Sequence, residues 1–554
     1  MRVFGWLLLL VLPVLSEAQT SFRYVFTFTD KAGTPFSLGQ PLEFLSQRAL
    51  DRRERQQIPL DSTDLPINPA YFQAVLAEGA IYLTHSKWLN SITVNVVNEA
   101  NRDAILNLPF VVGGVPVGKR SDSSFKLDKF QPIAVEKSLS EEERFSDSDY
   151  GLGFNQIDML GGVSMHNQGF RGEGMLIAVL DAGFTNVNTL EAFDSLRNDG
   201  RLLGGWDFVD RNNTIYENHS HGTSVLSTMA TYLPGQFIGT APKASYLLCR
   251  TEDGGSEFPV ELDYWIAGAE FADSAGADII NSSLGYTTFE DASLDFTYQD
   301  MDGNTTRGTR GADMAASKGI LVVNSAGNSG AGPWKYIGAP ADGDSVLAIG
   351  AVNEEGFIAN FSSEGPSSDG DIKPNVCAQG YQSTIVNTSG VVTTGNGTSF
   401  AGPILAGMAA CLWQPHKDSL TNMDIFHAIE KSAHQYTSPD GFYGYGIPNI
   451  AKAHLMLSGL NPNDPEQSEL LPVYPNPFND RFQGIFYSSE RQDVVIRLVN
   501  NLGQEVRRAE VVTEELSGAR FSFNDLEYLQ EGLYTLQIES DSGKYYIKLV
   551  KVRD

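Results

Sequence analysis

The longest regular pattern of apolar and polar positions lies between Tyr150 and about Leu460. Short apolar runs, rich in β-branched residues, alternate there with segments of helical length such as Val260–Ala275 and Gly311–Lys318. Strands that are apolar on both faces and are joined through helices form a parallel sheet covered on both sides. We therefore predict an α/β domain with its active site at the carboxyl ends of the strands. The expected strands are Met175–Leu180, Ala244–Leu248, Asp278–Asn281, Ile320–Asn324 and Val346–Ile349.

A smaller unit from Ser21 to about Val112 precedes this domain. Its first aromatic residues alternate with smaller ones, as in a half-buried strand, and Ile92, Val94 and Val96 mark another strand. We expect a helix over Pro41–Arg53, which gives a small α+β unit. Gly113 to Asp149 has little pattern, and its last part is dominated by Ser, Glu and Asp, which is typical of a solvated linker that proteases cut easily.

The two ends of the chain differ again. Arg2, the apolar run Val3–Leu15 and the small residues before Gln19 predict a secretory signal peptide, cleaved after Ala18. No other run is long and apolar enough to suggest a membrane-spanning helix. After a Pro- and Asn-rich linker at Asn461–Glu469, short alternating strands predict a β-sandwich to the end of the chain. The predicted parts are residues 1–18, 19–145, 146–460 and 461–554.

Composition excludes some partners. The formal charge of −29 argues against nucleic acid or an anionic membrane as the main partner. The three cysteines, an odd number without metal-binding spacing, are expected to be buried as small apolar residues.

Four polar residues stand where strands end or helices begin. Asp181 ends a buried strand, His221 opens a helical segment, and Asn328 follows another strand between glycines. Ser399 precedes the apolar run Ile404–Trp413, and Pro403 is expected in the first turn of that helix, which places Ser399 at or just before the helix N-terminus. Free backbone N–H groups there favour a developing anion.

Each residue also has an ordinary interpretation. Asp181 fits a turn cap, His221 a satisfied core histidine, and Asn328 a loop amide that holds its own backbone. The His219–His221 pair hints at a metal site, but no third ligand has suitable spacing. The joint occurrence of the four residues in one α/β domain favours a shared catalytic role.

These motifs resemble those of the subtilisin-like serine proteases, over roughly Tyr150 to Leu460. The matching segments are Val179-Leu180-Asp181-Ala182-Gly183, His221-Gly222-Thr223, Ser325-Ala326-Gly327-Asn328 and Gly397-Thr398-Ser399-Phe400-Ala401-Gly402-Pro403. The resemblance implies a catalytic triad of Asp181, His221 and Ser399, with Asn328 in the oxyanion hole. It also implies that Ser283, Leu284 and Gly285 line the substrate as an added strand, and that Gly338 forms the floor of a specificity pocket deep enough for a large apolar side chain. Ser224 departs from the family pattern, where many members have another His, with no expected catalytic consequence.

The flanking units resemble known domains as well. The unit from Ser21 to Val112 stands where such proteases carry an inhibitory propeptide. Leu470–Asp554 resembles the type A sorting domain of the type IX secretion system of Bacteroidetes, on Tyr474-Pro475-Asn476-Pro477-Phe478, Gly532-Leu533-Tyr534-Thr535-Leu536 and Lys548-Leu549-Val550-Lys551-Val552.

The sequence therefore predicts an α/β, subtilisin-like serine endopeptidase, made as a zymogen and secreted or placed at the cell surface via the periplasm. It would cleave proteins or peptides through an acyl-enzyme on Ser399, as a monomer, with its own propeptide and the type IX machinery as partners. The chemistry needs no cofactor. Asp300-Met301-Asp302-Gly303-Asn304 is more typical of an acidic surface turn than of a calcium loop, although structural calcium is compatible with the family.

Two other classes of function remain as alternatives. A surface adhesin or inactive homologue would use the cleft only to bind peptides, but a binding protein has no need of Asp181, His221, Asn328 and Ser399 together. A non-proteolytic esterase would not need the peptide-pairing segment at Ser283–Gly285.

Overall fold

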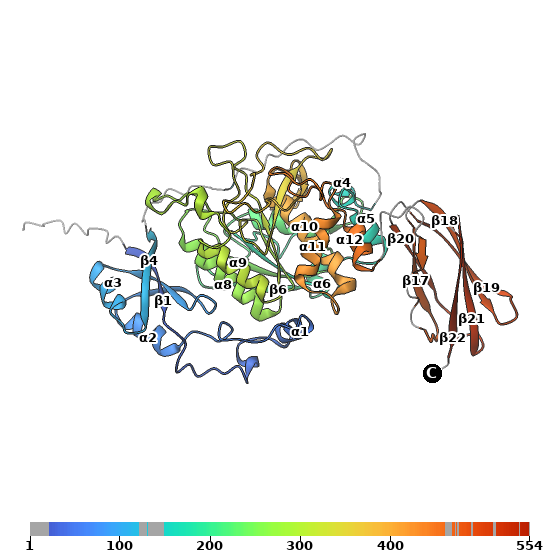
Figure 1. The fold of residues 1–554 in the computed structure, drawn as a ribbon, viewed down its shortest axis with the longest axis horizontal. Helices are drawn as coiled ribbons and strands as arrows, with labels where there is room; N and C mark the ends of the chain where they lie inside the picture. Colours follow the sequence, from blue (N-terminus) through green and yellow to red (C-terminus); the bar gives the residue numbers. More distant parts are fainter. Residues whose placement is uncertain are drawn as a thin grey trace, which may run out of the picture.

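Three parts follow one another in the computed structural model: an N-terminal unit in blue, a central α/β domain, and a C-terminal β domain in red (Figure 1). The N-terminal unit and the C-terminal domain lie at opposite ends of the view. The predicted signal peptide and most of the linker before Asp149 lie outside the described residues. The structure describes residues 21–120, 130, 149–459, 468–470, 473, 476–488, 491–513, 517–541 and 543–552.

The central domain is built on a seven-stranded sheet with the order β13-β12-β11-β10-β5-β9-β6, in which all neighbouring pairs are parallel. β5 is the first strand of this sheet in sequence and lies inside it, so later strands are added on both sides of β5. Such a switch point opens a crevice at the carboxyl ends of the strands. The strands are β5 Leu176–Asp181, β6 Leu202–Asp207, β9 Ser245–Arg250, β10 Ile279–Ser282, β11 Leu321–Ser325, β12 Val346–Val352 and β13 Val376–Gln379.

Helices cover both faces of this sheet. Ile177 and Val179 of β5 belong to the core that includes α7 and α10, whereas Ala178 and Leu180 face the core that includes α8 and α9. Burial on both faces explains why these strands are continuously apolar. The helices are α4 Phe154–Asp158, α5 Gly162–Asn167, α6 Asp194–Asn198, α7 His221–Ala230, α8 Val260–Ala275, α9 Arg307–Ser317, α10 Thr398–Trp413, α11 Asn422–Ser432 and α12 Ile450–Leu457.

The N-terminal unit is an antiparallel sheet of order β2-β3-β1-β4 with its own apolar core. The predicted helix over Pro41–Arg53 is wrong in its extent: a short 3₁₀ turn, Pro41–Glu43, is followed by a break, and Ser46 then caps a separate helix. The elements are β1 Ser21–Phe28, α1 Gln47–Arg55, α2 Pro69–Ala77, β2 Ile81–Ser86, β3 Ser91–Val96, α3 Glu99–Leu106 and β4 Val111–Arg120.

The C-terminal domain has two antiparallel sheets, β16-β17-β20 and β19-β18-β21-β22, around one apolar core. The alternating residues Val494, Ile496 and Leu498 are buried in it, as the pattern predicted. Among the described residues, no helix is both long and apolar enough to cross a bilayer. The strands are β16 Ser468–Leu470, β17 Phe482–Ser488, β18 Gln492–Asn500, β19 Glu505–Thr513, β20 Ser517–Phe523, β21 Gly532–Ser540 and β22 Gly543–Lys551.

The central strands predicted from sequence match β5, β9, β10, β11 and β12 to within a few residues, and α8 has the predicted bounds. Helix α9 begins four residues earlier than expected, at Arg307, because the Thr306 hydroxyl accepts a hydrogen bond from Thr309 N and caps the helix there. All three cysteines are free and buried, as predicted.

Candidate active site

Asp181 and His221 form a hydrogen-bonded pair at the carboxyl edge of the sheet. Asp181 is the last residue of β5, and His221 is the first residue of α7. Nδ1 of His221 lies 2.8 Å from Oδ1 and 3.0 Å from Oδ2 of Asp181, and the backbone N–H of Ala182 donates to Oδ1 at 2.7 Å. The carboxylate is fully buried, so these donors compensate its lost hydration. Because Nδ1 faces a carboxylate, Nε2 of His221 is left as the proton acceptor.

Two glycines allow this close approach. A Cβ at Gly222 would lie 2.5 Å from Gly183 O and 3.0 Å from the Asp181 Cβ. Gly183 itself has φ +152°, and a Cβ there would meet the backbone around His219 at 2.7 Å. Contacts under 3.0 Å with backbone cannot be relieved by a rotamer change. Glycine at position 222 therefore lets the backbone of Gly183 approach the start of α7 beside His221.

Ser399 is the second residue of α10 and is 8% exposed. The prediction for Pro403 needs correction: it lies in the second turn, inside the helix, and Ser399 lies in the first. Since proline has no N–H, it cannot donate to the carbonyl oxygen of Ser399 four residues earlier. Ser283 Oγ donates to that oxygen instead, at 2.9 Å. Ser283, the residue just after β10, thus replaces the missing helix hydrogen bond beside the nucleophile candidate.

Asn328 is exposed in the cleft, with its amide orientation set by the residue before Ser399. Its Oδ1 accepts from Thr398 N at 2.9 Å and from Thr398 Oγ1 at 3.0 Å. Thr398 Oγ1 also accepts from Gly327 N at 3.2 Å. Thr398 thus holds the side-chain oxygen of Asn328 with two donors. The Nδ2 group of Asn328 is therefore available to donate to an oxyanion beside Ser399.

A cavity of about 160 Å³ adjoins these residues. Ser283, Leu284, Gly285, Asn328, Gly338 and Ser399 all line it, so the structure brings the predicted substrate-binding residues to the nucleophile candidate. The segment after β10 lies beside Gly338, since Tyr286 and Ala339 form an antiparallel bridge.

Ser399 and His221 both lie in the part of the chain that the structure describes, and no hydrogen bond joins their side chains. The ring of Phe400, next to Ser399, lies 6.3 Å from the His221 ring. Hydrogen bonds of this kind often form only when substrate is bound.

The N-terminal unit contacts the catalytic domain through a buried ion cluster. Asp273 of α8 accepts from Arg52 at 2.5 Å, Arg53 at 2.8 Å and Lys87 at 3.2 Å. Burial would raise the pKa of Asp273, but the charges of Lys87, Arg52 and Arg53 outweigh it and hold this pKa far below its usual range. Removing one partner from such a cluster costs about 3–5 kcal/mol.

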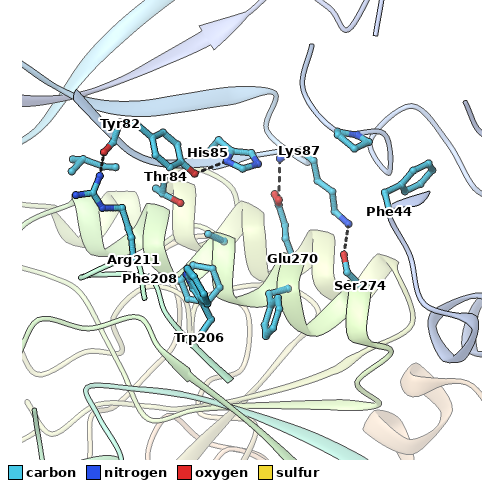
Figure 2. Close-up of a pocket in the computed structure, with 14 residues that line it drawn as sticks. Phe44, Tyr82, Thr84, His85, Lys87, Trp206, Phe208, Arg211, Glu270 and Ser274 are labelled. Atoms are coloured by element: carbon cyan, nitrogen blue, oxygen red, sulfur yellow. Dashed lines mark hydrogen bonds between the residues drawn. The ribbon is translucent and has the colours of Figure 1, made fainter. Parts of the chain in front are cut away.

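A second carboxylate on α8 accepts hydrogen bonds from a turn of the N-terminal unit. Glu270 accepts from Ser86 Oγ at 2.6 Å and from the backbone N–H groups of Lys87 and Trp88 at 3.0 Å. Figure 2 shows Glu270 and Lys87 beside a cavity of about 460 Å³, where β2 faces α8 and the end of β6. Tyr82 and His85, both on β2, are joined by a hydrogen bond of 2.7 Å on one side of this cavity (Figure 2).

The acidic turn considered for calcium uses its carboxylates locally. Asp300 accepts from Thr297 N and Oγ1, and Asp302 accepts from the backbone N–H groups of Asn304 and Thr305. Within the described residues, two groups of three carboxylates have oxygens within 4.8 Å of one another: Asp344, Asp369 and Asp371, which lie beside Gly303 of this turn, and Glu252, Glu257 and Glu261. No such group includes the His219–His221 pair.

Sequence reasoning missed several residues of the cleft. Thr398 lies within the serine motif, but its role depends on the distant Asn328. Tyr336, Ser363 and Glu252 also line the cavity, and the sequence gives no periodic signal for them. Phe130 lies there too, in a region of weak pattern.

Three family profiles match successive parts of the chain. The subtilase family (peptidase S8) matches residues 172–446, the Bacteroidota peptidase S8 propeptide domain matches 23–129, and a secretion system C-terminal sorting domain matches 472–552. The sorting domain implies secretion or a place at the cell surface.

Curated relatives agree with the family match. Subtilisin E of Bacillus subtilis is 32% identical over 54% of this chain and 70% of its own length. Subtilisin of Bacillus pumilus is 32% identical over 54% of this chain and 97% of its own length. The thermostable alkaline protease of Halalkalibacterium halodurans is 30% identical over 54% of this chain and 72% of its own length. With its catalytic domain, propeptide and sorting domain, the chain belongs to the subtilase family, as a secreted serine protease made as a zymogen.

Proposed function

We propose that this endopeptidase cleaves its substrates through an acyl-enzyme on Ser399. His221 Nε2 removes the Ser399 hydroxyl proton as the oxygen attacks the peptide carbonyl. Asp181 holds the imidazole in the required tautomer and stabilises the imidazolium. His221 then gives the proton to the leaving amine. A water molecule, deprotonated in the same way, releases the acyl group and restores Ser399.

The tetrahedral intermediate carries a negative oxygen that needs fixed donors. Asn328 Nδ2 and the backbone N–H of Ser399 supply them, and the latter has no partner inside the helix because it belongs to the first turn. The oriented Asn328 amide is the observation that best supports catalysis over binding alone. A peptide-binding protein would not need a donor aimed at a charge that develops only during reaction.

Substrate would lie as an extended strand along Ser283, Leu284 and Gly285. Gly338 lines the cavity without a side chain, so a large apolar residue before the cleaved bond fits there. All these groups come from one chain, so a monomer is sufficient, and none of them requires a cofactor. We further propose that the N-terminal unit inhibits the enzyme in the zymogen, with the first cut between Gly113 and Tyr150. The sorting domain then directs export from the periplasm.

A serine-reactive fluorophosphonate probe tests this function directly. We expect the processed enzyme to be labelled on Ser399, identified by peptide mass spectrometry, and to lose protease activity in proportion. His221→Ala should lose both labelling and activity, by several orders of magnitude in turnover. His427→Ala, an exposed histidine on α11, is the matched control and should change neither. Labelling of another serine, or full activity in Ser399→Ala, would refute the assignment.

A further inference from the structure

Phe130 lies on the rings of two histidines in the cleft. Its ring centroid is 4.2 Å from that of His221, with an interplanar angle of 29°, and 4.6 Å from that of His219, with an angle of 40°. The same side chain lines the cavity that Ser399 and Leu284 line. A segment of this chain therefore places an aromatic side chain where a substrate side chain would lie beside the nucleophile.

The ring of His219 is held in position by its neighbours. Its Nδ1 accepts from the backbone N–H of His221 at 3.0 Å. Its carbonyl oxygen accepts from Thr185 Oγ1 at 2.9 Å. On the other side, a Cβ at Gly254 would lie 3.0 Å from Cδ2 of the ring, so glycine leaves room for an imidazole. The position of the ring is thus built into the fold rather than set by Phe130.

Phe130 lies nearer to the His221 ring than Phe400 does. The Nδ1 edge of His221 is occupied by Asp181, and the buried Phe400 ring lies 6.3 Å away. Phe130, at 4.2 Å, covers the ring from the cleft. A substrate side chain that replaces Phe130 would rest on both imidazoles at once.

We infer that the rings of His219 and His221 form a subsite for an aromatic side chain of the substrate. Phe130 occupies this subsite in the uncleaved chain, and His219 is its specificity-determining residue. The inference rests on the proposed peptidase function and adds a substrate class: peptides with Phe, Tyr or Trp near the cleaved bond. Ring pairs of this geometry gain specificity beyond area burial, because the edge and face of each ring carry opposite partial charges.

The test begins with wild-type enzyme and a mixture of short synthetic peptides, with the cut sites identified by mass spectrometry. Besides the residue directly before the cut, which the Gly338 pocket takes, we expect a second position close to the cut to be enriched in aromatic residues. Two matched peptides with Phe or Ala at that position then give the ratio of their kcat/KM values. For wild type this ratio should be about 3–10, as expected for one aromatic pair.

His219→Asn is the informative variant. Asparagine Oδ1 can still accept from His221 N–H, so the variant removes the ring while keeping the backbone of His221 in place. We expect the Phe-to-Ala ratio of kcat/KM values to fall by roughly threefold or more, towards the ratio that an aliphatic residue in place of Phe would give. Processing of the variant to mature size confirms that it folds, and His427→Ala should leave the ratio unchanged.

The outcomes separate the two proposals. Equal cleavage by wild type and Ser399→Ala would refute the proposed function and the subsite together. Cleavage that depends on Ser399 without aromatic enrichment at this second position would refute the subsite alone. An unchanged Phe-to-Ala ratio in His219→Asn would also refute it, since the selectivity would then come from another wall of the cleft.

Discussion

Replacing Thr398 by valine should slow catalysis through Asn328 while leaving the helix intact. Thr398 is fully buried, and valine has nearly the same shape, so the change removes one hydroxyl without opening a cavity. Asn328 Oδ1 would lose the donor at 3.0 Å and keep the backbone donor at 2.9 Å. One anchor remains, so the amide should be loosened rather than released.

The size of the effect follows from this partial loss. A hydrogen bond of this kind contributes about 0.5–1.5 kcal/mol, and each 1.36 kcal/mol is tenfold in rate, so kcat should fall about 2–13-fold. Removing the amide itself, in Asn328→Ala, should cost about 10²–10³ in kcat. Thr398→Val also leaves Gly327 N without its acceptor, which lowers stability and is measured separately by thermal unfolding.

A double-mutant cycle on a chromogenic peptide decides whether Thr398 acts through Asn328. Thr398→Ser keeps the hydroxyl and should stay near wild type. In the Asn328→Ala background, Thr398→Val should have almost no further effect on kcat, because the group that it positions is absent. If the two losses multiply, or if Thr398→Val changes KM instead of kcat, the positioning role is wrong.

Three further predictions concern the pocket, the tail and the propeptide. In Gly338→Val, a Cβ would lie 2.9 Å from the Thr287 methyl group. We expect kcat/KM for peptides with Phe before the cut to fall roughly tenfold relative to peptides with Ala there. An equal loss of kcat/KM for Phe and Ala peptides would exclude a pocket role. A chain ending near Leu460 should keep activity but no longer reach the medium, measured in periplasmic and medium fractions; normal export would exclude the sorting role. Burial lowers the pKa of His85, so its contribution to holding the propeptide is complete above about pH 6.5 and is lost as pH falls towards the lowered pKa. Native mass spectrometry of the processed complex at pH 7.5 and 5.5 should show faster release in acid, and His85→Gln should remove part of that difference.

The sequence was sufficient for the central sheet because burial on both faces leaves a strong local pattern. It also located Asp181, His221, Asn328 and Ser399, since each follows a strand or opens a helix and parallel strands end at one edge. The position of Pro403 was misjudged for a physical reason: a tertiary partner, Ser283 Oγ, satisfies the carbonyl oxygen that proline leaves without a donor. Local sequence cannot show such a compensation.

The cleft residues that sequence reasoning missed depend on long-range packing. Thr398 and Asn328 are 70 residues apart, and only the fold brings the amide oxygen to the hydroxyl. Phe130 lies in a stretch without strand or helix periodicity, so its partners, the two histidine rings, are visible only in three dimensions.

The attachment of the propeptide shows the same limit most clearly. Arg52 and Arg53 belong to a strongly charged helix, yet both are buried on Asp273, some 220 residues away. Burying these charges together costs hydration, and their mutual attraction and hydrogen bonds offset that cost while the two surfaces remain in contact. Once the propeptide is removed, Asp273 is left facing water, where a carboxylate is stable without its partners. The ion cluster therefore supplements an apolar contact, in which Val25, Leu83 and Val117 of the N-terminal unit pack with Phe258, Val260 and Tyr264 of the catalytic domain.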